Sequence, residues 1–169
     1  MIVIADSGPL RYLIVIEHIH LLPMLYGRIL FPPGVASELT QAATPEPVRI
    51  WLNHLPEWAA IQSPQSSASA FPSALGLGER EAIALAEEVG ADVLLVDDEA
   101  ARIEAGRRLI PVQGTLGVLD LAAEHGLLSD LPDAIERLKK TNFRGSGNLL
   151  DFFLERDAAR KRRLAAPGS

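Results

Sequence analysis

Acidic residues stand at or near the ends of several predicted helices and strands in this chain. They are Asp6, Glu38, Glu79, Glu81, Asp97 and Asp98. Hard divalent cations such as Mg²⁺ take oxygen ligands, and proteins usually hold Mg²⁺ with a few carboxylates and several waters. Carboxylates that converge from separate elements repel one another unless a cation neutralises them. The pattern therefore predicts a divalent-metal site in which Asp6, Glu81 and Asp98 come from neighbouring strand and helix ends.

Taken one at a time, these acids also have ordinary structural explanations. Asp6 after a strand is a common helix cap, and Asp97 or Asp98 is placed to cap the helix that follows them. Glu79 and Glu81 fall in a first helical turn, where the helix dipole favours negative charge. A lone glutamate inside a mid-length helix most often faces solvent. Only the combination favours a functional site over separate structural roles.

The stretch from Leu75 to Arg102 is the one around which the site is organised. Its sequence, LGLGEREAIALAEEVGADVLLVDDEAAR, predicts a loop, a helix, a turn, a strand and the start of another helix. Gly90 ends the first helix as a C-terminal cap does. The strand at 93–96 is apolar throughout, which indicates a sheet covered on both faces. The acids after it then lie at the rim where open parallel sheets bind ligands.

The remaining elements follow the same alternation of strands and helices. Apolar runs at 2–5 and 28–31 predict strands, and the run at 110–112 predicts a short edge strand because it contains a proline. Helical patterns follow these runs, and no hairpin signal separates them. The pattern predicts an α/β fold with three layers, α/β/α, around a central, mostly parallel sheet of four to five strands.

Length and composition fit a single compact domain with a real core, because 48% of the 169 residues are hydrophobic and 22% are charged. We expect one domain at 1–169, with a core at 1–128, a C-terminal helical extension at 129–164 and a frayed tail at 165–169. The segment 63–74, rich in Ser, Ala, Gln and Pro, is expected to be a mobile loop. The absence of cysteine excludes disulfides and thiolate sites. No apolar run reaches the ~18 residues of a membrane span, and the start of the chain reads as a strand rather than a signal peptide.

The net charge of −6 is unevenly distributed along the chain. From Asp133 onward there are 9 basic and 5 acidic residues, whereas the residues before Asp133 carry a net charge of −10. An acidic body with a basic tail is compatible with a metal site beside a nucleic-acid contact. A helical tail with a solvated charged face explains the same distribution equally well.

Other kinds of site are poorly supported by the sequence. Gly76-x-Gly78 lacks the strand-then-helix fingerprint of a dinucleotide site, and no GxxxxGK[ST] phosphate loop is present. His18 and His20 form an H-x-H pair at a predicted helix end, where surface residues are the simpler reading. Phosphatases with an aspartate nucleophile carry a DxD pair, but Asp6 is followed by Ser-Gly.

Five segments together resemble the PIN domain, the fold of the VapC-type ribonuclease toxins, and most closely its DUF3368 branch. They are IVIADSGPL, LYGRILFPPGVASEL, GLGEREAIALA, ADVLLVDDEAAR and PVQGTLGVLDLA, in the expected order between Ile2 and Ala123. The helices after Leu128 resemble the C-terminal extension of that family. The resemblance implies a PIN-like form of the predicted α/β/α fold.

The resemblance also implies an endoribonuclease that depends on Mg²⁺ or Mn²⁺, in which the metal activates a water for attack on an RNA phosphodiester. The implied catalytic acids are Asp6, Glu38, Glu81 and Asp98. The implied metal ligands are Asp6, Glu81 and Asp98, with Asp97 as a close alternative to Asp98. Ser7, Glu79 and Thr115 are implied auxiliary residues.

RNA contacts are expected from basic residues around this site. They are Arg11, Arg102, Arg107, Arg108 and those of the final helix. Arg11 stands where this branch usually has a small or apolar residue, and it either neutralises the acidic pocket or forms part of the substrate path. By resemblance, the expected partners are an RNA substrate, a cognate antitoxin and a second copy of the chain in a homodimer. The protein is expected in the cytoplasm, with no membrane partner. The alternative is a PIN-like module that binds RNA or protein without catalysis.

Overall fold

The computed structural model of the chain describes residues 1–66 and 70–168. The chain folds into two compact units, residues Met1–Thr115 and Leu116–Ser169. In the part that the structure describes, no helix is both long and apolar enough to cross a membrane. The first unit contains the central sheet and all six of the acids singled out from the sequence.

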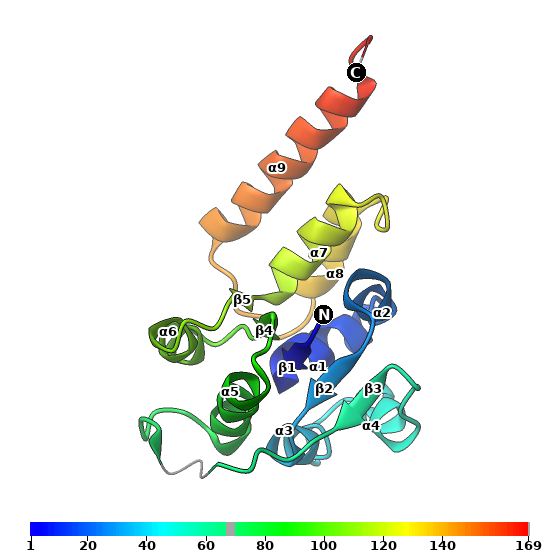
Figure 1. Cartoon of the computed structure of the whole chain (residues 1–169). Helices are drawn as coiled ribbons and strands as arrows, with labels where there is room; N and C mark the ends of the chain where they lie inside the picture. Colours follow the sequence, from blue (N-terminus) through cyan, green and yellow to red (C-terminus); the bar gives the residue numbers. More distant parts are fainter. Residues whose placement is uncertain (67–69, 169) are drawn as a thin grey trace. The chain divides into compact units, whose positions relative to one another are not determined.

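The first unit alternates strands and helices along the chain (Figure 1). Its strands are β1 (Val3–Ala5), β2 (Ile29–Phe31), β3 (Ala59–Ile61), β4 (Val93–Leu95) and β5 (Val112–Gln113). Its helices are α1 (Ser7–Val15), α2 (Leu21–Tyr26), α3 (Pro33–Glu38), α4 (Glu46–Asn53), α5 (Leu77–Val89) and α6 (Glu99–Arg107).

The five strands form one parallel sheet in the order β3-β2-β1-β4-β5. Ile4 of β1 pairs with Leu30 on one side and with Leu94 on the other. The strand order runs outward in one direction from β1 to β3 and in the other from β4 to β5. Ligands of open α/β sheets bind where the order reverses, outside the carboxyl ends of the strands. Here that point lies between the ends of β1 and β4, which Asp6 and Asp97 follow closely in the chain.

Right-handed crossovers explain the layers on either side of this sheet. The connections from β1 to β3 advance in one direction and those from β4 to β5 in the other, so their helices cover opposite faces. This arrangement confirms the predicted three-layer α/β/α class, with a sheet that is parallel throughout. The core is apolar: Ile4, Phe31 and Leu94 are all fully buried.

Helices α3 and α5 approach each other at two glycines. A Cβ added to Gly34 would lie only 3.2 Å from the Cα of Gly78. A Cβ added to Gly78 would meet the Glu38 carboxyl group, with 2.8 Å to its Cδ atom. The two glycines therefore let the end of α3, which carries Glu38, lie directly against the start of α5.

Strand β3 was not predicted from the sequence. Its three residues, Ala59–Ile61, have no strong alternation of apolar and polar side chains. The strand forms because it pairs with β2: Ile29 N–H donates to the Trp58 carbonyl, and Gln62 N–H donates to the Phe31 carbonyl. Strand β5 is an edge strand, as predicted, but it spans Val112–Gln113 instead of 110–112, so Pro111 lies just before it.

The segment expected to be a loop, 63–74, includes residues 67–69, which lie outside the described residues. Its two flanks contact helices of the same unit. The backbone N–H of Gln65 donates to the carboxylate of Glu88 in α5. Phe71 lies under the guanidinium of Arg108, 4.0 Å from the ring centroid. These contacts fix the described ends of the segment beside α5 and α6.

The second unit consists of helical segments. Helix α7 (Thr115–Glu124) begins at the boundary between the units and is followed by α8 (Leu131–Lys139) and α9 (Gly147–Ala165). The apolar stripe of α8 is buried, but α9 buries only Asp157 and Arg160. Arg160 pairs with Asp157 of its own helix and with Asp120 and Glu124 of α7. Ala165, expected in the frayed tail, is the last residue of α9.

Leu109, just after α6, is expected to be a strained position. It has a φ of +59° and is 91% exposed, so no burial compensates for the left-handed backbone. Ile110 N–H donates back to the Ala105 carbonyl across this residue, an arrangement that normally places glycine at the left-handed position. Leu109→Gly is expected to raise the free energy of unfolding by about 1 kcal/mol in urea denaturation, because a Cβ disfavours this conformation. Leu109→Ala keeps the Cβ and is the matched control; equal stability of both variants would contradict the explanation.

Candidate active site

Asp6 lies at the carboxyl end of β1, with its backbone N–H donating to the Leu95 carbonyl at 2.8 Å. The residue is buried, with 4% of its surface exposed. Its side chain accepts no capping hydrogen bond from α1. Among the described residues, its Oδ1 atom has no hydrogen-bond partner. Asp6 therefore stands at a helix-cap position without making the side-chain hydrogen bond of a cap. Its carboxylate is buried and incompletely bonded, so a capping role does not explain it.

Other carboxylates surround Asp6 and disfavour its ionised form. Burial raises the pKa of Asp6 most, partly offset by the backbone N–H of Ser7, and the charges of Glu38, Glu79 and Asp97 raise it further, to about 8. A cation bound beside this carboxyl group would stabilise its ionised form, because the positive charge offsets the repulsion from the neighbouring carboxylates.

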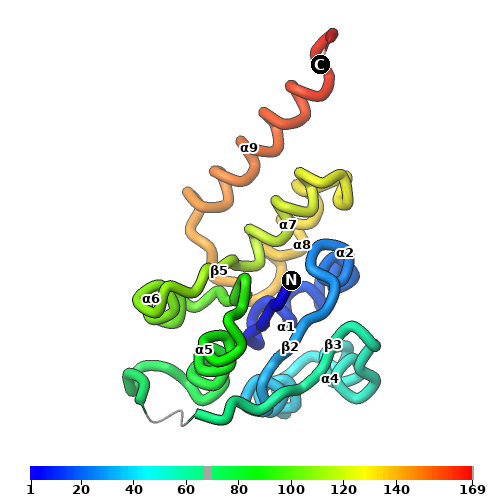
Figure 2. The backbone as a smooth tube through the Cα atoms, in the orientation of Figure 1, coloured from blue at the N-terminus to red at the C-terminus, as the bar shows by residue number. Residues whose placement is uncertain are grey.

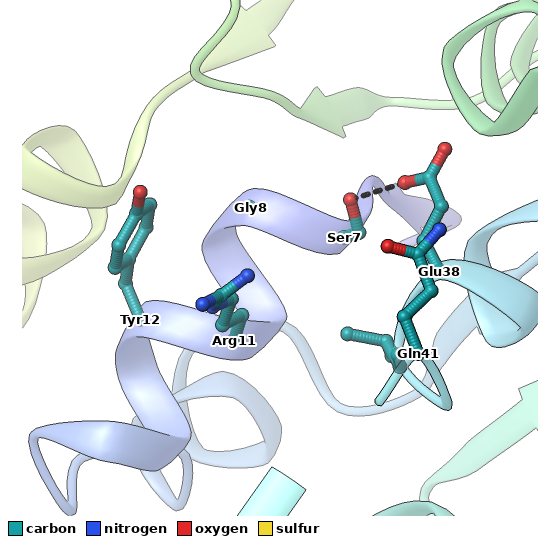
Figure 3. Close-up of a pocket in the computed structure, with 7 residues that line it drawn as sticks. Ser7, Gly8, Arg11, Tyr12, Glu38 and Gln41 are labelled. Atoms are coloured by element: carbon teal, nitrogen blue, oxygen red, sulfur yellow. Dashed lines mark hydrogen bonds between the residues drawn. The ribbon is translucent and has the colours of Figure 1, made fainter. Parts of the chain in front are cut away.

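Glu38 reaches this cluster from the end of α3. The Ser7 hydroxyl donates a hydrogen bond to its Oε2 atom at 2.5 Å (Figure 3). The other side of the Glu38 carboxylate lies against Gly78 of α5. Helices α1, α3 and α5 thus meet at one carboxylate, and Ser7 orients it.

Asp97 is held by the residue that starts α7. The backbone N–H and the hydroxyl of Thr115 donate to its two carboxylate oxygens, at 2.7 and 2.6 Å. Burial raises the pKa of Asp97, although the Thr115 hydrogen bonds and the Arg102 charge oppose the rise. A Cβ added to Gly114 would lie 2.9 Å from Asp97 Oδ1, so glycine there leaves room for the carboxylate.

The other three acids each accept a backbone hydrogen bond at a helix start. Glu79 bonds Gly76 N–H, Glu81 bonds Gly34 N–H and Asp98 bonds Ala101 N–H, at 2.9, 2.6 and 3.0 Å. Burial raises the pKa of Glu79, and the charges of Asp98 and Glu38 add to the rise despite the Gly76 hydrogen bond. Glu79 is therefore electrostatically part of the cluster.

The structure brings the acids to one rim but not to one coordination point. Within residues 1–66 and 70–168, no three acidic or histidine side chains are close enough together to hold a metal ion as they stand. The chemistry of the donors nevertheless fits a hard cation, because every candidate is a carboxylate oxygen and one of them, Asp6 Oδ1, is buried and unpartnered. Convergence on one ion would require these side chains to move, and Asp98 is exposed and Glu38 half-buried.

The basic residues proposed for RNA binding have different surroundings. Arg102 donates to the Val96 carbonyl, and Arg108 pairs with Glu87 and Glu104. Arg107 pairs with Glu104 but leaves 70% of its side chain exposed. In the final helix, most of the basic residues are paired: Arg156, Arg160, Lys161 and Arg163 all contact carboxylates of the second unit.

Arg11 differs because it lines a cavity instead of forming an ion pair. The cavity has a volume of about 350 Å³ and is lined by Ser7, Gly8, Arg11, Tyr12, Glu38, Leu39 and Gln41. Figure 3 shows Arg11 and Tyr12 projecting from α1, with the Glu38 carboxylate and Gln41 on the opposite wall. Across the described parts of the chain, Arg11 has no hydrogen bond or salt bridge.

Gln41 and Tyr12 were not predicted as site residues. Gln41 lies three residues after Glu38, in the turn that follows α3, and its backbone N–H donates to the Glu38 carbonyl at 3.5 Å. This short separation in the sequence is a usable signal. Nothing in its type or spacing singles out Tyr12, because the cavity that it lines depends on how α1 meets the segment after α3.

The comparison with known families agrees with this geometry. Residues 2–158 match the DUF3368 family, which is described as a PIN domain. No curated protein is similar enough to the chain to count as a match. The match covers most of the chain and includes the parallel sheet, the acids at its carboxyl rim and the start of α9. The chain therefore belongs to the DUF3368 family of PIN domains.

Proposed function

We propose that this chain is a metal-dependent endoribonuclease of the PIN type. The observation that carries the proposal is the buried carboxylate of Asp6, whose Oδ1 atom has no partner and whose neighbours are further carboxylates. A fold has no stabilising reason to gather like charges at a buried point, since their repulsion costs free energy. A bound divalent cation removes that cost.

Asp6 would be the principal ligand. Glu38, Glu79 and Asp97 are the further candidates because their charges act on Asp6, although each of them also accepts hydrogen bonds. Asp98 and Glu81 stay candidates, each with one oxygen already bonded to a helix start. When bound, Mg²⁺ or Mn²⁺ lowers the pKa of a coordinated water and offsets charge on the phosphate. Ser7 holds Glu38 and Thr115 holds Asp97, so both hydroxyls orient acids. Arg11 would contact the RNA backbone, with Arg107 as a second exposed cation.

An RNA substrate and the VapC resemblance suggest a toxin that a cognate antitoxin restrains, and a homodimer as the assembly. A toxin of this kind acts in the cytoplasm, where its RNA target lies. We keep the expected plan of one PIN-like domain, with a core at 1–128 and a C-terminal helical extension at 129–164, as part of this proposal. The compact units of the structure divide earlier, between Thr115 and Leu116, and the ion pairs between α7 and α9 lie within the second unit.

A second candidate is a PIN-like module that binds RNA or a protein without cutting. One observation favours it: the acids of the described residues do not converge on one point, and several are engaged in hydrogen bonds at helix starts. The two candidates differ in whether a metal binds at Asp6.

Binding of Mn²⁺ to the native state is expected to stabilise the chain. At a hundredfold excess over the Kd, the free energy of unfolding should rise by ~2.7 kcal/mol, measured by thermal or urea denaturation. The same titration of Asp6→Asn should give no increase, whereas Glu57→Gln, an exposed acid ahead of β3, should respond like the wild type. RNA cleavage that stops with a chelator and returns with Mn²⁺ completes the test. An equal Mn²⁺ response in all three chains would exclude Asp6 as the ligand.

A further inference from the structure

The cavity beside Arg11 adjoins the acidic cluster directly. Ser7 and Glu38 belong to both, since they line the cavity and are joined by the hydrogen bond that orients Glu38. Asp6 precedes Ser7 in the chain, at the end of β1. A ligand in the cavity therefore lies next to the proposed position of the scissile phosphate.

Arg11 gives this cavity an unpaired positive charge. In the described residues it forms no ion pair, even with Glu38 on the opposite wall, although the body of the chain is acidic and Arg102 and Arg108 are bonded to protein groups. A planar guanidinium matches phosphate oxygens in a bidentate geometry. The Glu38 carboxylate would repel a phosphate, so the phosphate group must lie on the Arg11 side.

The rest of the lining suits a nucleobase. The Gln41 amide offers both a donor and an acceptor, as the edge of a base requires, and Tyr12 and Leu39 contribute ring and aliphatic surface. A volume of about 350 Å³ is at the small end of the range for ligand pockets and suits one nucleotide. A base paired within a duplex cannot enter such a cavity, whereas an unpaired base can be splayed out into it.

From these contacts we propose that the cavity binds one unpaired RNA nucleotide adjoining the cleaved phosphodiester, with its phosphate on Arg11 and its base edge on Gln41. This inference rests on the proposed ribonuclease function and assigns the residues that would hold the nucleotide next to the cleaved bond. Arg11 and Gln41 are positioning residues, because the acids and not they would act at the reacting phosphate.

Binding should be measured separately from cleavage. Fluorescence anisotropy with short homopolymeric RNA oligonucleotides, single-stranded and annealed into duplexes, is carried out on full chains carrying Asp6→Asn so that no cutting interferes. Single strands should bind more tightly than duplexes. Adding Arg11→Ala should raise the Kd about tenfold and lower the slope of log K against log salt by ~0.7, which is the effect of one lost phosphate contact to a single strand. Adding Arg11→Lys should restore much of the salt slope.

Gln41→Ala should leave the salt slope unchanged and flatten the preference among the four bases. Arg28→Ala is the matched control, because Arg28 is exposed ahead of β2, at the opposite end of the parallel strands from the acids. Unchanged affinity and salt slope in Arg11→Ala, with the fold intact by circular dichroism, would overturn the inference even if the wild type cuts RNA. Arg11-dependent binding in a wild-type chain that never cuts would instead uphold the cavity and reject the ribonuclease proposal.

Discussion

Asp6→Asn is expected to lose RNA cleavage by on the order of a thousandfold while gaining stability in the absence of metal. A bound metal contributes several kcal/mol of transition-state stabilisation, and each 1.4 kcal/mol is about tenfold in rate. The gain in stability has a separate cause: asparagine keeps the shape of the side chain but removes a charge that burial and three neighbouring carboxylates oppose.

The gain should depend on pH in a defined way. The pKa of Asp6 is raised from 3.8 to about 8 in the folded chain, so between these values the folded state holds a proton that the unfolded state has released. The free energy of unfolding of the metal-free wild type should therefore fall as pH rises through this interval and level off above it. Because a tenfold change in a proton-binding constant corresponds to ~1.4 kcal/mol, the total loss should reach several kcal/mol.

Urea denaturation in a chelator across this pH range, on the wild type and Asp6→Asn, measures the effect. The difference between the two chains should be small near pH 4 and largest above about pH 8, because only the wild type acquires the buried charge. Glu57→Gln should follow the wild-type curve. A constant difference at all pH values would show that Asp6 stays ionised in the fold.

Arg160→Met is expected to cost about 3–5 kcal/mol of stability in the second unit, since removal of one partner leaves buried charges uncompensated. The Arg160 side chain is 6% exposed and contacts Asp157 and Asp120, which are themselves almost fully covered. Figure 2 shows α9 running in the same direction as α7, and the pairing of residues along the two helices agrees. Methionine has a similar length and supplies no charge.

The neighbouring Arg162→Met is the matched control, because Arg162 is exposed and has no ion pair in the described part of α9. Hydrogen exchange of the amides in 147–165 and urea denaturation would report the loss. Faster exchange throughout α9 in Arg160→Met alone is the expected result. Equal protection in both variants would mean that α9 is held by contacts other than this ion-pair network.

The sequence was most informative where the chain is locally regular. The apolar run that became β4 and the glycine that ends α5 fixed the position of Asp97 and Asp98 at the rim without any alignment. It could not decide between these two neighbours. In the structure Asp97 is held against Thr115, whereas Asp98 caps α6 at the surface. That distinction depends on where α7 begins, which is a property of the fold.

Glu79 and Glu81 show a similar limit. Both fall in the first turn of α5, and the family resemblance favours Glu81. The structure bonds Glu81 to Gly34 of α3 and leaves Glu79 sharing the electrostatic field of Asp98 and Glu38. Helical spacing predicts that the two side chains point from different sides of α5. Which side faces the other acids is decided by the contact between α3 and α5. Their catalytic roles stay predictions.

The contact between Gly34 and Gly78 has a consequence for mutational scans of this chain. Any larger residue at either position forces α3 away from α5, and the carboxylates of Glu38 and Glu81 lie in the way of the added atoms. Both glycines should therefore score as intolerant as the acids in a selection for activity, although neither has a side chain that touches RNA. Ranking positions by intolerance alone would place these two glycines among the proposed catalytic acids, and a stability measurement run in parallel would separate the two groups.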